Sequence, residues 1–185
     1  MRVIEKLAVV LCVFGFLFFG ADEDAHADQS PVQGGTSIGG IVGYDTDASE
    51  PFGGVDLRFD MPASPTLLVA INPAVQYYFI SAGDLGLDSF HTLQFDTNIL
   101  LKYPLEDAAM TLFAGAGVAV LHTRASSGAL SDSNTEVGFN PIVAGMEVDV
   151  DPSVSLLAQI RATRISVEGQ SFTSFSLMGG VLFGF

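Results

Sequence analysis

The segment TLQFDTNILLKY, residues 92–103, alternates between two kinds of side chain along its whole length. One face carries Leu93, Phe95, Thr97, Ile99, Leu101 and Tyr103, and the other carries Thr92, Gln94, Asp96, Asn98, Leu100 and Lys102. Successive side chains of a β-strand point to opposite faces. A period of two therefore predicts a strand with one apolar face and one mostly polar face.

The same period recurs along the chain and predicts a series of strands. We expect eight strands, at residues 36–45, 52–61, 66–79, 90–104, 110–124, 136–150, 154–167 and 172–185. They exceed the average strand length of about 5–6 residues. The sixth run changes phase near Asn140–Pro141, where we expect a β-bulge because proline is confined to edges and bulges of sheets.

The connections between these runs alternate in character. Tight turns rich in Pro, Asp and Ser are expected at 61–65, 105–107 and 151–153, whereas longer polar loops are expected at 46–51, 80–89 and 125–134, with 168–171 a shorter member of that set. With an even number of strands, the barrel's first and last strands both have their free ends at the tight-turn end. This layout is typical of bacterial outer-membrane barrels.

The strands fit either a soluble barrel, with its apolar face inside, or a membrane barrel, with its apolar face outside. The polar face carries mainly small or uncharged residues, whereas a solvated surface needs many more charges. On the apolar face we expect aromatic girdles at the loop end (Tyr44, Phe52, Tyr77, Phe79 and Phe90) and at the turn end (Phe59, Tyr103, Phe183 and Phe185). The predicted fold is an all-β, eight-stranded, antiparallel, up-and-down transmembrane β-barrel.

The N-terminus has the pattern of a secretory signal peptide. Arg2 and Lys6 precede an apolar block at 7–20, and Ala25-His26-Ala27 offers a cleavage site. We expect a signal peptide at 1–27, a flexible lead at 28–35 and the barrel at 36–185. An uncleaved anchor is the alternative, but the block is short for a membrane span of about 20 residues.

Composition narrows the chemistry of the exported chain. Cys12 is the only cysteine, so cleavage excludes disulfides and thiol chemistry. The formal net charge of −14 argues against nucleic acid as a partner.

The chain resembles the eight-stranded outer-membrane β-barrel family of OmpA-transmembrane-domain and OmpX-like proteins. The resemblance rests on the signal peptide, on LFAGAGVAV (112–120) and on the closing FSLMGGVLFGF (175–185). It implies export through the periplasm into the outer membrane and contact with outer-membrane lipids and lipopolysaccharide. It also implies recognition by the barrel-assembly machinery through the last strand, whose assembly signal is Phe175, Leu177, Val181, Phe183 and Phe185.

Charged residues also fall on the expected inner face. They are Asp56, Arg58, Asp60, Asp96, Lys102, Glu147, Asp149 and Arg161. An eight-stranded barrel is just wide enough for side chains to fill it, and charges in such a space must pair or be hydrated. We expect an interior polar network extended by Gln76, Gln94, Asn98 and Gln159. A narrow, cation-preferring leak is the alternative.

Catalytic and metal candidates are weak. Some barrels of this family are enzymes that act on lipid A, and the deacylase type needs a His and a Ser together near the outer rim. His91 and His122 fall near the loop end, but FHTL (90–93) and LHTR (121–124) contain no adjacent Ser-Asn pair. We therefore predict no enzyme, no catalytic residue and no cofactor, with these histidines bonding to lipid headgroups.

The acidic residues of the expected loops are Asp45, Asp47, Glu50, Asp84, Asp88 and Asp132. DTDASE (45–50) loosely suggests a calcium site but lacks the rest of an EF-hand. We predict solvated acids and no metal site.

These features predict a small integral outer-membrane barrel with a structural or envelope-integrity role. The alternatives are a low-conductance pore and loop-mediated binding of a surface partner or lipopolysaccharide.

Overall fold

The computed structural model describes residues 34–185 apart from 82, 84–85, 106–107, 129 and 168–169. The predicted signal peptide and residues 28–33 of the predicted lead lie outside this part of the chain. Among the described residues, no helix is long and apolar enough to cross a bilayer.

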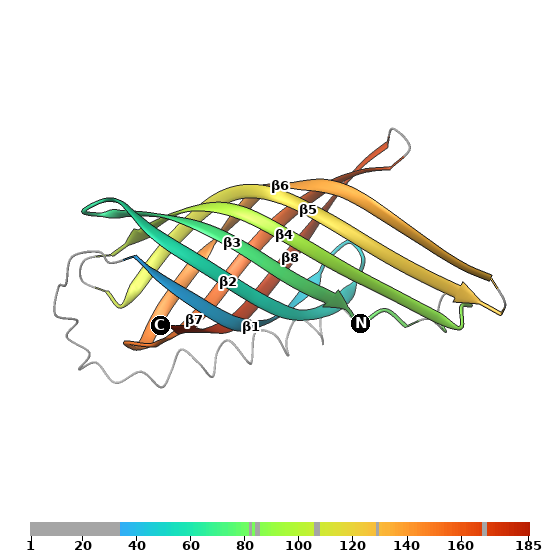
Figure 1. Cartoon of the computed structure of the whole chain (residues 1–185), viewed down its shortest axis with the longest axis horizontal. Helices are drawn as coiled ribbons and strands as arrows, with labels where there is room; N and C mark the ends of the chain where they lie inside the picture. Colours follow the sequence, from blue (N-terminus) through green and yellow to red (C-terminus); the bar gives the residue numbers. More distant parts are fainter. Residues whose placement is uncertain (1–33, 82, 84–85, 106–107, 129, 168–169) are drawn as a thin grey trace.

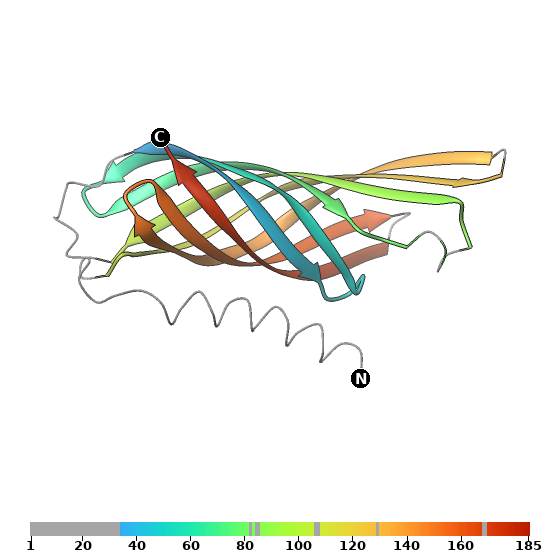
Figure 2. The same ribbon diagram turned by 90° about the horizontal axis from the view of Figure 1, so that it is seen from below.

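The predicted fold is confirmed. The strands are β1 (Gly35–Asp45), β2 (Glu50–Ser64), β3 (Leu67–Tyr78), β4 (Ser89–Pro104), β5 (Met110–Ser127), β6 (Leu130–Asp151), β7 (Val154–Val167) and β8 (Gln170–Gly184). Each strand pairs antiparallel with the next, and β1 pairs with β8 from Ser37↔Gly184 to Asp45↔Ser176, which closes the barrel. Closure gives every strand two hydrogen-bonded neighbours (Figures 1 and 2).

The expected bulge in the sixth run is also confirmed. Asn140 pairs with Gly117 and Val143 pairs with Gly115, so β6 carries one residue more than β5 across this interval. The pairing with β7 shifts at the same place, between Phe139 and Ile142. The extra residue changes the phase of the strand, so that Asn140, Val143 and Glu147 are all buried in the barrel.

The expected loop at 125–134 was wrong. Most of it continues the β5–β6 ladder, with Ala125 paired to Asp132 and Ser127 to Leu130, around a turn in which Gly128 has φ 59°. Backbone pairing does not depend on the polarity of the side chains, so this Ser- and Asp-containing segment forms a hairpin. The hairpin reaches beyond the other strand ends at the loop end of the barrel (Figure 1).

Phe52 is a second correction, because it does not belong to an outer girdle. Its side chain is 1% exposed and its ring centroid lies 5.2 Å from that of Tyr78 inside the barrel. Gly43 on β1 makes room for this ring, since a Cβ at Gly43 would overlap it. Phe52 has the same parity as Gly54, Asp56 and Arg58, which also belong to the inner face.

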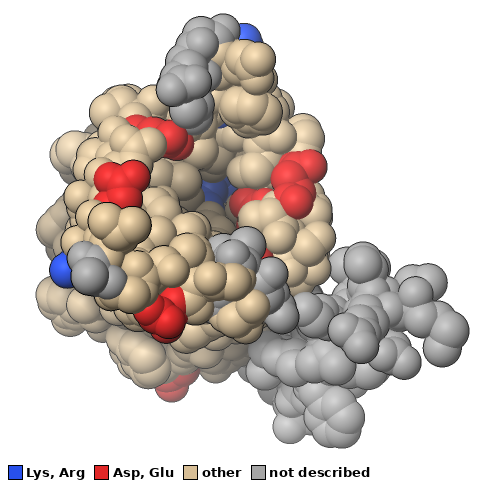
Figure 3. Space-filling model, turned by 90° about the vertical axis from the view of Figure 1, so that its right-hand side faces the viewer, with Lys and Arg blue, Asp and Glu red and all other residues tan. Residues whose placement is uncertain are grey.

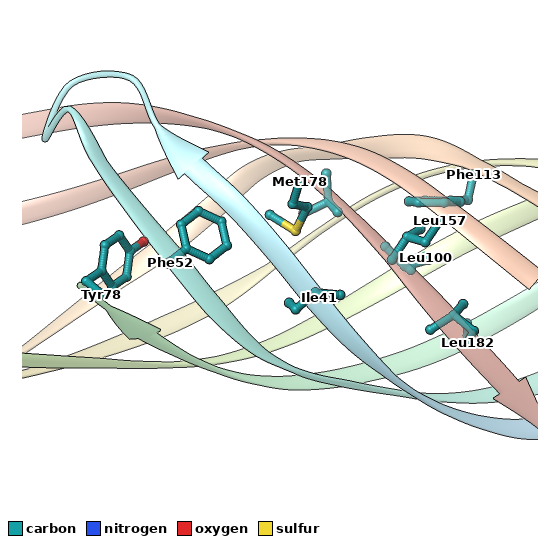
Figure 4. Close-up of a cluster of buried hydrophobic side chains, with 10 residues drawn as sticks. Ile41, Phe52, Tyr78, Leu100, Phe113, Leu157, Met178 and Leu182 are labelled. Carbon is teal, nitrogen blue, oxygen red and sulfur yellow. The ribbon is translucent and has the colours of Figure 1, made fainter. Parts of the chain in front are cut away.

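The outer surface is apolar along most of each strand. Large exposed apolar side chains include Ile38, Val42, Val55, Phe59, Ile71, Val75, Phe95, Ile99, Leu101, Leu112, Val118, Val137, Ile160, Phe175 and Phe183. The interior mixes polar groups with a smaller apolar set. Tyr78 and Phe52 lie together toward the loop end, and Phe113, Leu157, Leu100 and Leu182 lie toward the turn end (Figure 4).

Candidate functional site: the charged interior of the barrel

Two groups of polar side chains fill the barrel. We call the first the turn-side cluster and define it as Asp56, Arg58, Asp60, Lys102, Glu147 and Gln159. We call the second the loop-side cluster and define it as Asn72, Gln76, Gln94, Asp96, Asn98, Asn140, Arg161 and Thr163. Both clusters consist of inward positions of several strands, which the closed sheet brings face to face across the lumen.

The turn-side cluster is held by ion pairs. Arg58 Nε donates to Asp56 Oδ1 at 2.8 Å, and Arg58 Nη1 donates to Glu147. Lys102 Nζ bridges the remaining acids, at 2.6 Å from Asp60 Oδ2 and 2.8 Å from Glu147 Oε2. Two cations, from β2 and β4, therefore share three carboxylates from β2 and β6, and Glu147 bonds to both cations.

Arg58 also contacts two uncharged side chains. Arg58 Nη2 donates to Gln159 Oε1 at 3.1 Å, and the guanidinium carbon lies 4.6 Å from the centroid of the Phe113 ring. A guanidinium over a ring face at this distance gains a cation–π attraction. Asp60 Oδ1, at the edge of the cluster, is buried without a hydrogen-bond partner among the described residues.

The loop-side cluster contains one ion pair surrounded by amides. Arg161 Nη1 donates to Asp96 Oδ2, and Arg161 Nη2 donates to Gln76 Oε1 at 2.8 Å. Asp96 also accepts hydrogen bonds from Gln76 Nε2 at 2.9 Å, Gln94 Nε2 at 2.8 Å and Asn140 Nδ2 at 3.1 Å. Three side-chain amides thus donate to one buried carboxylate, and they replace the water molecules that would solvate it outside the barrel.

Further hydrogen bonds extend the loop-side cluster around the barrel wall. Asn140 Nδ2 donates to Asn98 Oδ1 at 2.9 Å, and Asn98 Nδ2 donates to Asn72 Oδ1 at 3.1 Å. Thr163 Oγ1 donates to Asn140 Oδ1 at 2.9 Å. Gly117 leaves space for this chain of amides, because a Cβ there would collide with Asn98 Oδ1.

The structure brings together most of the charges that the sequence assigned to the inner face. Asp56, Arg58, Asp60, Lys102 and Glu147 meet in one cluster, and Asp96 and Arg161 meet in the other. Asp149 joins neither. Asp149 is exposed because β6 extends beyond the packed interior at this position, at the turn end of the barrel. Its carboxylate accepts a hydrogen bond from Ser155 Oγ.

Some residues of the loop-side cluster were not among the expected members. Asn72 and Thr163 have the inward parity of their strands, so the alternation could have identified them. Asn140 was missed because it precedes the bulge, where parity changes. Its inward direction follows from the pairing of β6 with its neighbours.

The two histidines near the loop end contact hydroxyl groups. A hydrogen bond of 2.7 Å joins the Tyr77 hydroxyl to His91 Nδ1, and one of 2.9 Å joins His122 Nδ1 to Thr135 Oγ1. Neither imidazole contacts a carboxylate within the described part of the chain. That the chain is not an enzyme stays a prediction.

The acids of the first loop serve local structure. Asp45 Oδ1 accepts hydrogen bonds from the amides of Asp47 and Ala48, and Asp47 Oδ2 accepts one from the amide of Phe175. Across residues 34–185, with the gaps given above, no group of three or more His, Cys, Asp or Glu is arranged to hold a metal ion.

Four residues of the expected assembly signal lie on the outer face of β8, and the fifth, Phe185, directly follows this strand. Phe175, Phe183 and Phe185 are exposed, and Leu177 and Val181 are half-buried. The Phe185 amide donates to the Thr36 carbonyl at 3.0 Å, so the last residue is tied to β1.

Comparison with solved structures identifies the architecture. The N-terminal β-barrel domain of OprF from Pseudomonas aeruginosa matches with a TM-score of 0.62 at 14% identity, over 83% of this chain and 100% of that domain. Neisserial surface protein A matches with a TM-score of 0.61 at 13% identity, over 85% of this chain and 100% of that chain. The attachment invasion locus protein Ail of Yersinia pestis matches with a TM-score of 0.61 at 15% identity, over 82% and 97%.

No protein-family model matches the sequence, and no curated protein matches it either. The outer-membrane enzyme PagL is also among the structural matches, with a TM-score of 0.48, a likeness too weak to bear on activity. The resemblance noted in the sequence is thus shown in the structure at the level of the fold: the chain folds as an eight-stranded barrel of the type found in outer-membrane proteins.

Proposed function

We propose that this protein is a small integral outer-membrane barrel with a structural role in the cell envelope, whose lumen is closed by its own side chains. The observation that carries the proposal is the burial of the inner face. Arg58, Asn72, Leu100 and Val143 are 0% exposed. A side chain that lined a water-filled path would retain accessible surface, so these positions support a filled lumen rather than a pore.

The outer face supports placement in a bilayer. Large apolar side chains such as Val42, Ile99 and Val137 are more than half exposed. A continuous apolar belt of this kind would promote association in water. In a bilayer the same belt meets lipid chains, and the closed sheet leaves no unpaired strand edge in the hydrocarbon.

The arrangement of the interior charges also favours closure over conduction. Every buried cation in the described chain is engaged by at least one carboxylate. An ion crossing the lumen would have to displace these contacts and separate the pairs, which costs several kcal/mol in a low-dielectric interior. From the loop end the barrel mouth is hollowed, with acidic side chains around it and basic surface deep inside (Figure 3).

Conductance in planar lipid bilayers tests the closed lumen. We expect the wild-type protein to give no stable current steps, and the Arg58→Ala/Arg161→Ala variant to give small ones because both clusters lose their central cation. Stable steps from the wild type would overturn the proposal in favour of a narrow pore. The matched control is Arg124→Ala/Arg164→Ala, which removes two exposed arginines and should stay silent.

The structural role is tested in the bacterium that encodes the protein. We expect the protein in the outer-membrane fraction, and its deletion should increase entry of detergents and large antibiotics. Unchanged permeability after deletion would argue against an envelope-integrity role, and recovery of the protein outside the outer membrane would overturn the location.

Binding of a surface partner is a second candidate function, favoured by the β5–β6 hairpin that projects from the loop end. Its outer part carries polar side chains and the highly exposed Leu130. Replacing residues 125–134 with a short turn should abolish attachment of cells to host surfaces if this hairpin binds a partner, and should leave folding intact. Unchanged attachment would exclude the hairpin.

The last strand is also a proposed partner site, for the barrel-assembly machinery. Deleting Phe185 removes an exposed terminal aromatic ring and the backbone bond to Thr36. We expect the truncated protein to accumulate less in the outer membrane, measured by heat-modifiable mobility on gels. Replacing Phe172, an exposed phenylalanine near the other end of β8, with Ala is the control, and equal loss in both variants would argue against a terminal signal.

A further inference from the structure

The positive charges of the described chain are distributed very unevenly. The five Lys and Arg residues are Arg58, Lys102, Arg124, Arg161 and Arg164. Arg58, Lys102 and Arg161 are buried in the interior ion pairs. Only Arg124 and Arg164 remain on the outside, and both lie in the parts of their strands nearest the loop end.

Arg124 belongs to a patch that begins where the apolar outer face ends. On the outer face of β4, Phe95 and Leu93 are followed by His91. On β5, Val118 and Val120 are followed by His122 and Arg124. On β6, the outward residues beyond Phe139 and Val137 are Thr135 and Ser133. Three adjacent strands therefore change from apolar to hydrogen-bonding side chains at the same level.

The register of the strands brings these side chains together. His91 is the direct partner of Arg124 across β4 and β5, and Leu93 is the partner of His122. On the other side of β5, Thr135 pairs with His122 and Ser133 pairs with Arg124. We call this set, with Tyr77 of β3 beside it, the headgroup patch: Tyr77, His91, His122, Arg124, Ser133 and Thr135.

The hydrogen bonds within the patch orient its donors. Tyr77 bonds to Nδ1 of His91, and Thr135 bonds to Nδ1 of His122, so each imidazole presents Nε2 away from its partner. The Tyr77 and His91 rings also contact, with centroids 6.0 Å apart. Arg124 is exposed, and its guanidinium forms no ion pair or hydrogen bond with any described residue. The patch thus holds a guanidinium beside two fixed imidazoles.

The acids of the same hairpin do not neutralise this patch. Asp132 pairs with Ala125, and Glu136 pairs with Leu121, so both have the parity opposite to Arg124 and His122. Asp132 accepts a hydrogen bond from the Ser133 amide, and Glu136 accepts one from Asn134. In a chain with a formal net charge of −14, a basic patch on the outer wall is a local exception.

We propose that the headgroup patch binds the phosphate of an anionic lipid in the outer leaflet. A phosphate offers several acceptor oxygens, which match the forked donors of Arg124 and the imidazole Nε2 groups. The adjacent apolar surface of Phe95, Val118 and Val137 would contact the acyl chains of the same lipid. The inference rests on the proposed location in the outer membrane and adds the ligand class and the residues.

Native mass spectrometry of the full-length processed protein tests the inference. The protein is placed in phosphatidylcholine nanodiscs that contain a minor fraction of diphosphoryl lipid A, and the retained lipid is counted. We expect wild type to retain lipid A, and Arg124→Gln to lower its apparent affinity by about tenfold, the effect of losing one charge-assisted contact. His91→Gln should lower it less, because Arg124 remains.

Arg164→Gln is the matched control, because it removes the other outward arginine from a different wall of the barrel. Its affinity for lipid A should stay within about twofold of wild type. Equal losses for Arg124→Gln and Arg164→Gln would overturn the patch, because they would show a general effect of charge. Equal retention of lipid A and phosphatidylcholine by wild type would overturn it as well.

Inorganic phosphate is the competing ligand. If it displaces lipid A from the patch at millimolar concentration, the site takes free phosphate and the lipid assignment is wrong. Membrane fractionation and conductance test the proposed function separately, so a failed lipid test leaves those results standing. Circular dichroism of each variant in the same nanodiscs establishes that it is folded.

Discussion

The turn-side and loop-side clusters occupy the same lumen but stabilise charge by different means. In the turn-side cluster, Arg58 and Lys102 are held by three carboxylates, and Glu147 bonds to both cations. In the loop-side cluster, Asp96 has a single cationic partner, Arg161, and three amide donors. One cluster shares its charges among several partners, and the other depends on one pair.

This difference determines how strongly the removal of one charged side chain destabilises each cluster. When the shared Glu147 is removed, Arg58 keeps Asp56 and Lys102 keeps Asp60. When either member of a lone buried pair is removed, the remaining charge is left in a low-dielectric space, where its desolvation cost is uncompensated. The loop-side cluster should therefore be the more sensitive of the two, although it contains fewer charges.

The largest expected effect is that of Asp96→Ala. This change leaves Arg161 buried without a carboxylate and should lower the free energy of unfolding by about 3–5 kcal/mol. The measurement is urea unfolding of the refolded protein in phospholipid vesicles. Asp149→Ala, at an exposed acid on the same inward parity, should change it by less than about 0.5 kcal/mol. Equal effects at the two positions would contradict a packed loop-side cluster.

The partner of Asp96 provides a sharper test of the same prediction. If the cost arises from the unpaired guanidinium, Asp96→Ala/Arg161→Met should be more stable than Asp96→Ala alone, because the loop-side cluster then contains no unpaired charge. A double variant that is less stable than Asp96→Ala would show that Arg161 stabilises the barrel without its acid.

Glu147→Gln should have a smaller effect, of about 2 kcal/mol, because Arg58 keeps Asp56 and Lys102 keeps Asp60. The same unfolding measurement applies. A loss as large as that of Asp96→Ala would show that the turn-side cluster does not share its charges. The control Glu136→Gln changes an acid that forms no ion pair with a described residue and accepts a hydrogen bond from Asn134.

Thr163→Val should have the smallest effect, about 1 kcal/mol, because it removes one neutral hydrogen bond to Asn140 and keeps the volume of the side chain. Thr173→Val, on an exposed part of β8, is the matched control. A change above about 3 kcal/mol would mean that Thr163 fixes the amides around Asp96 and is not a peripheral member.

Much of the fold follows from alternation along the chain. Leu93 to Lys102 could be assigned to faces from the sequence because a strand has a fixed period of two. Phe52 shows the limit of an argument from residue type. Its parity with Asp56 and Arg58 placed it inside, but its aromatic ring suggested a girdle. The packing of Phe52 on Tyr78, with Gly43 opposite, decided in favour of parity.

The amino-acid pattern alone predicts the strands, the bulge near Pro141, the closed barrel and the inward direction of most buried charges. All of these depend on local periodicity and on the backbone's need for hydrogen bonds. Which of these charges meet, in contrast, depends on the three-dimensional arrangement of the strands. Glu147 is 89 positions from Arg58, and Asp96 is 65 positions from Arg161. Partners across a lumen are set by the stagger of all eight strands together, a property of the closed sheet that no single strand carries.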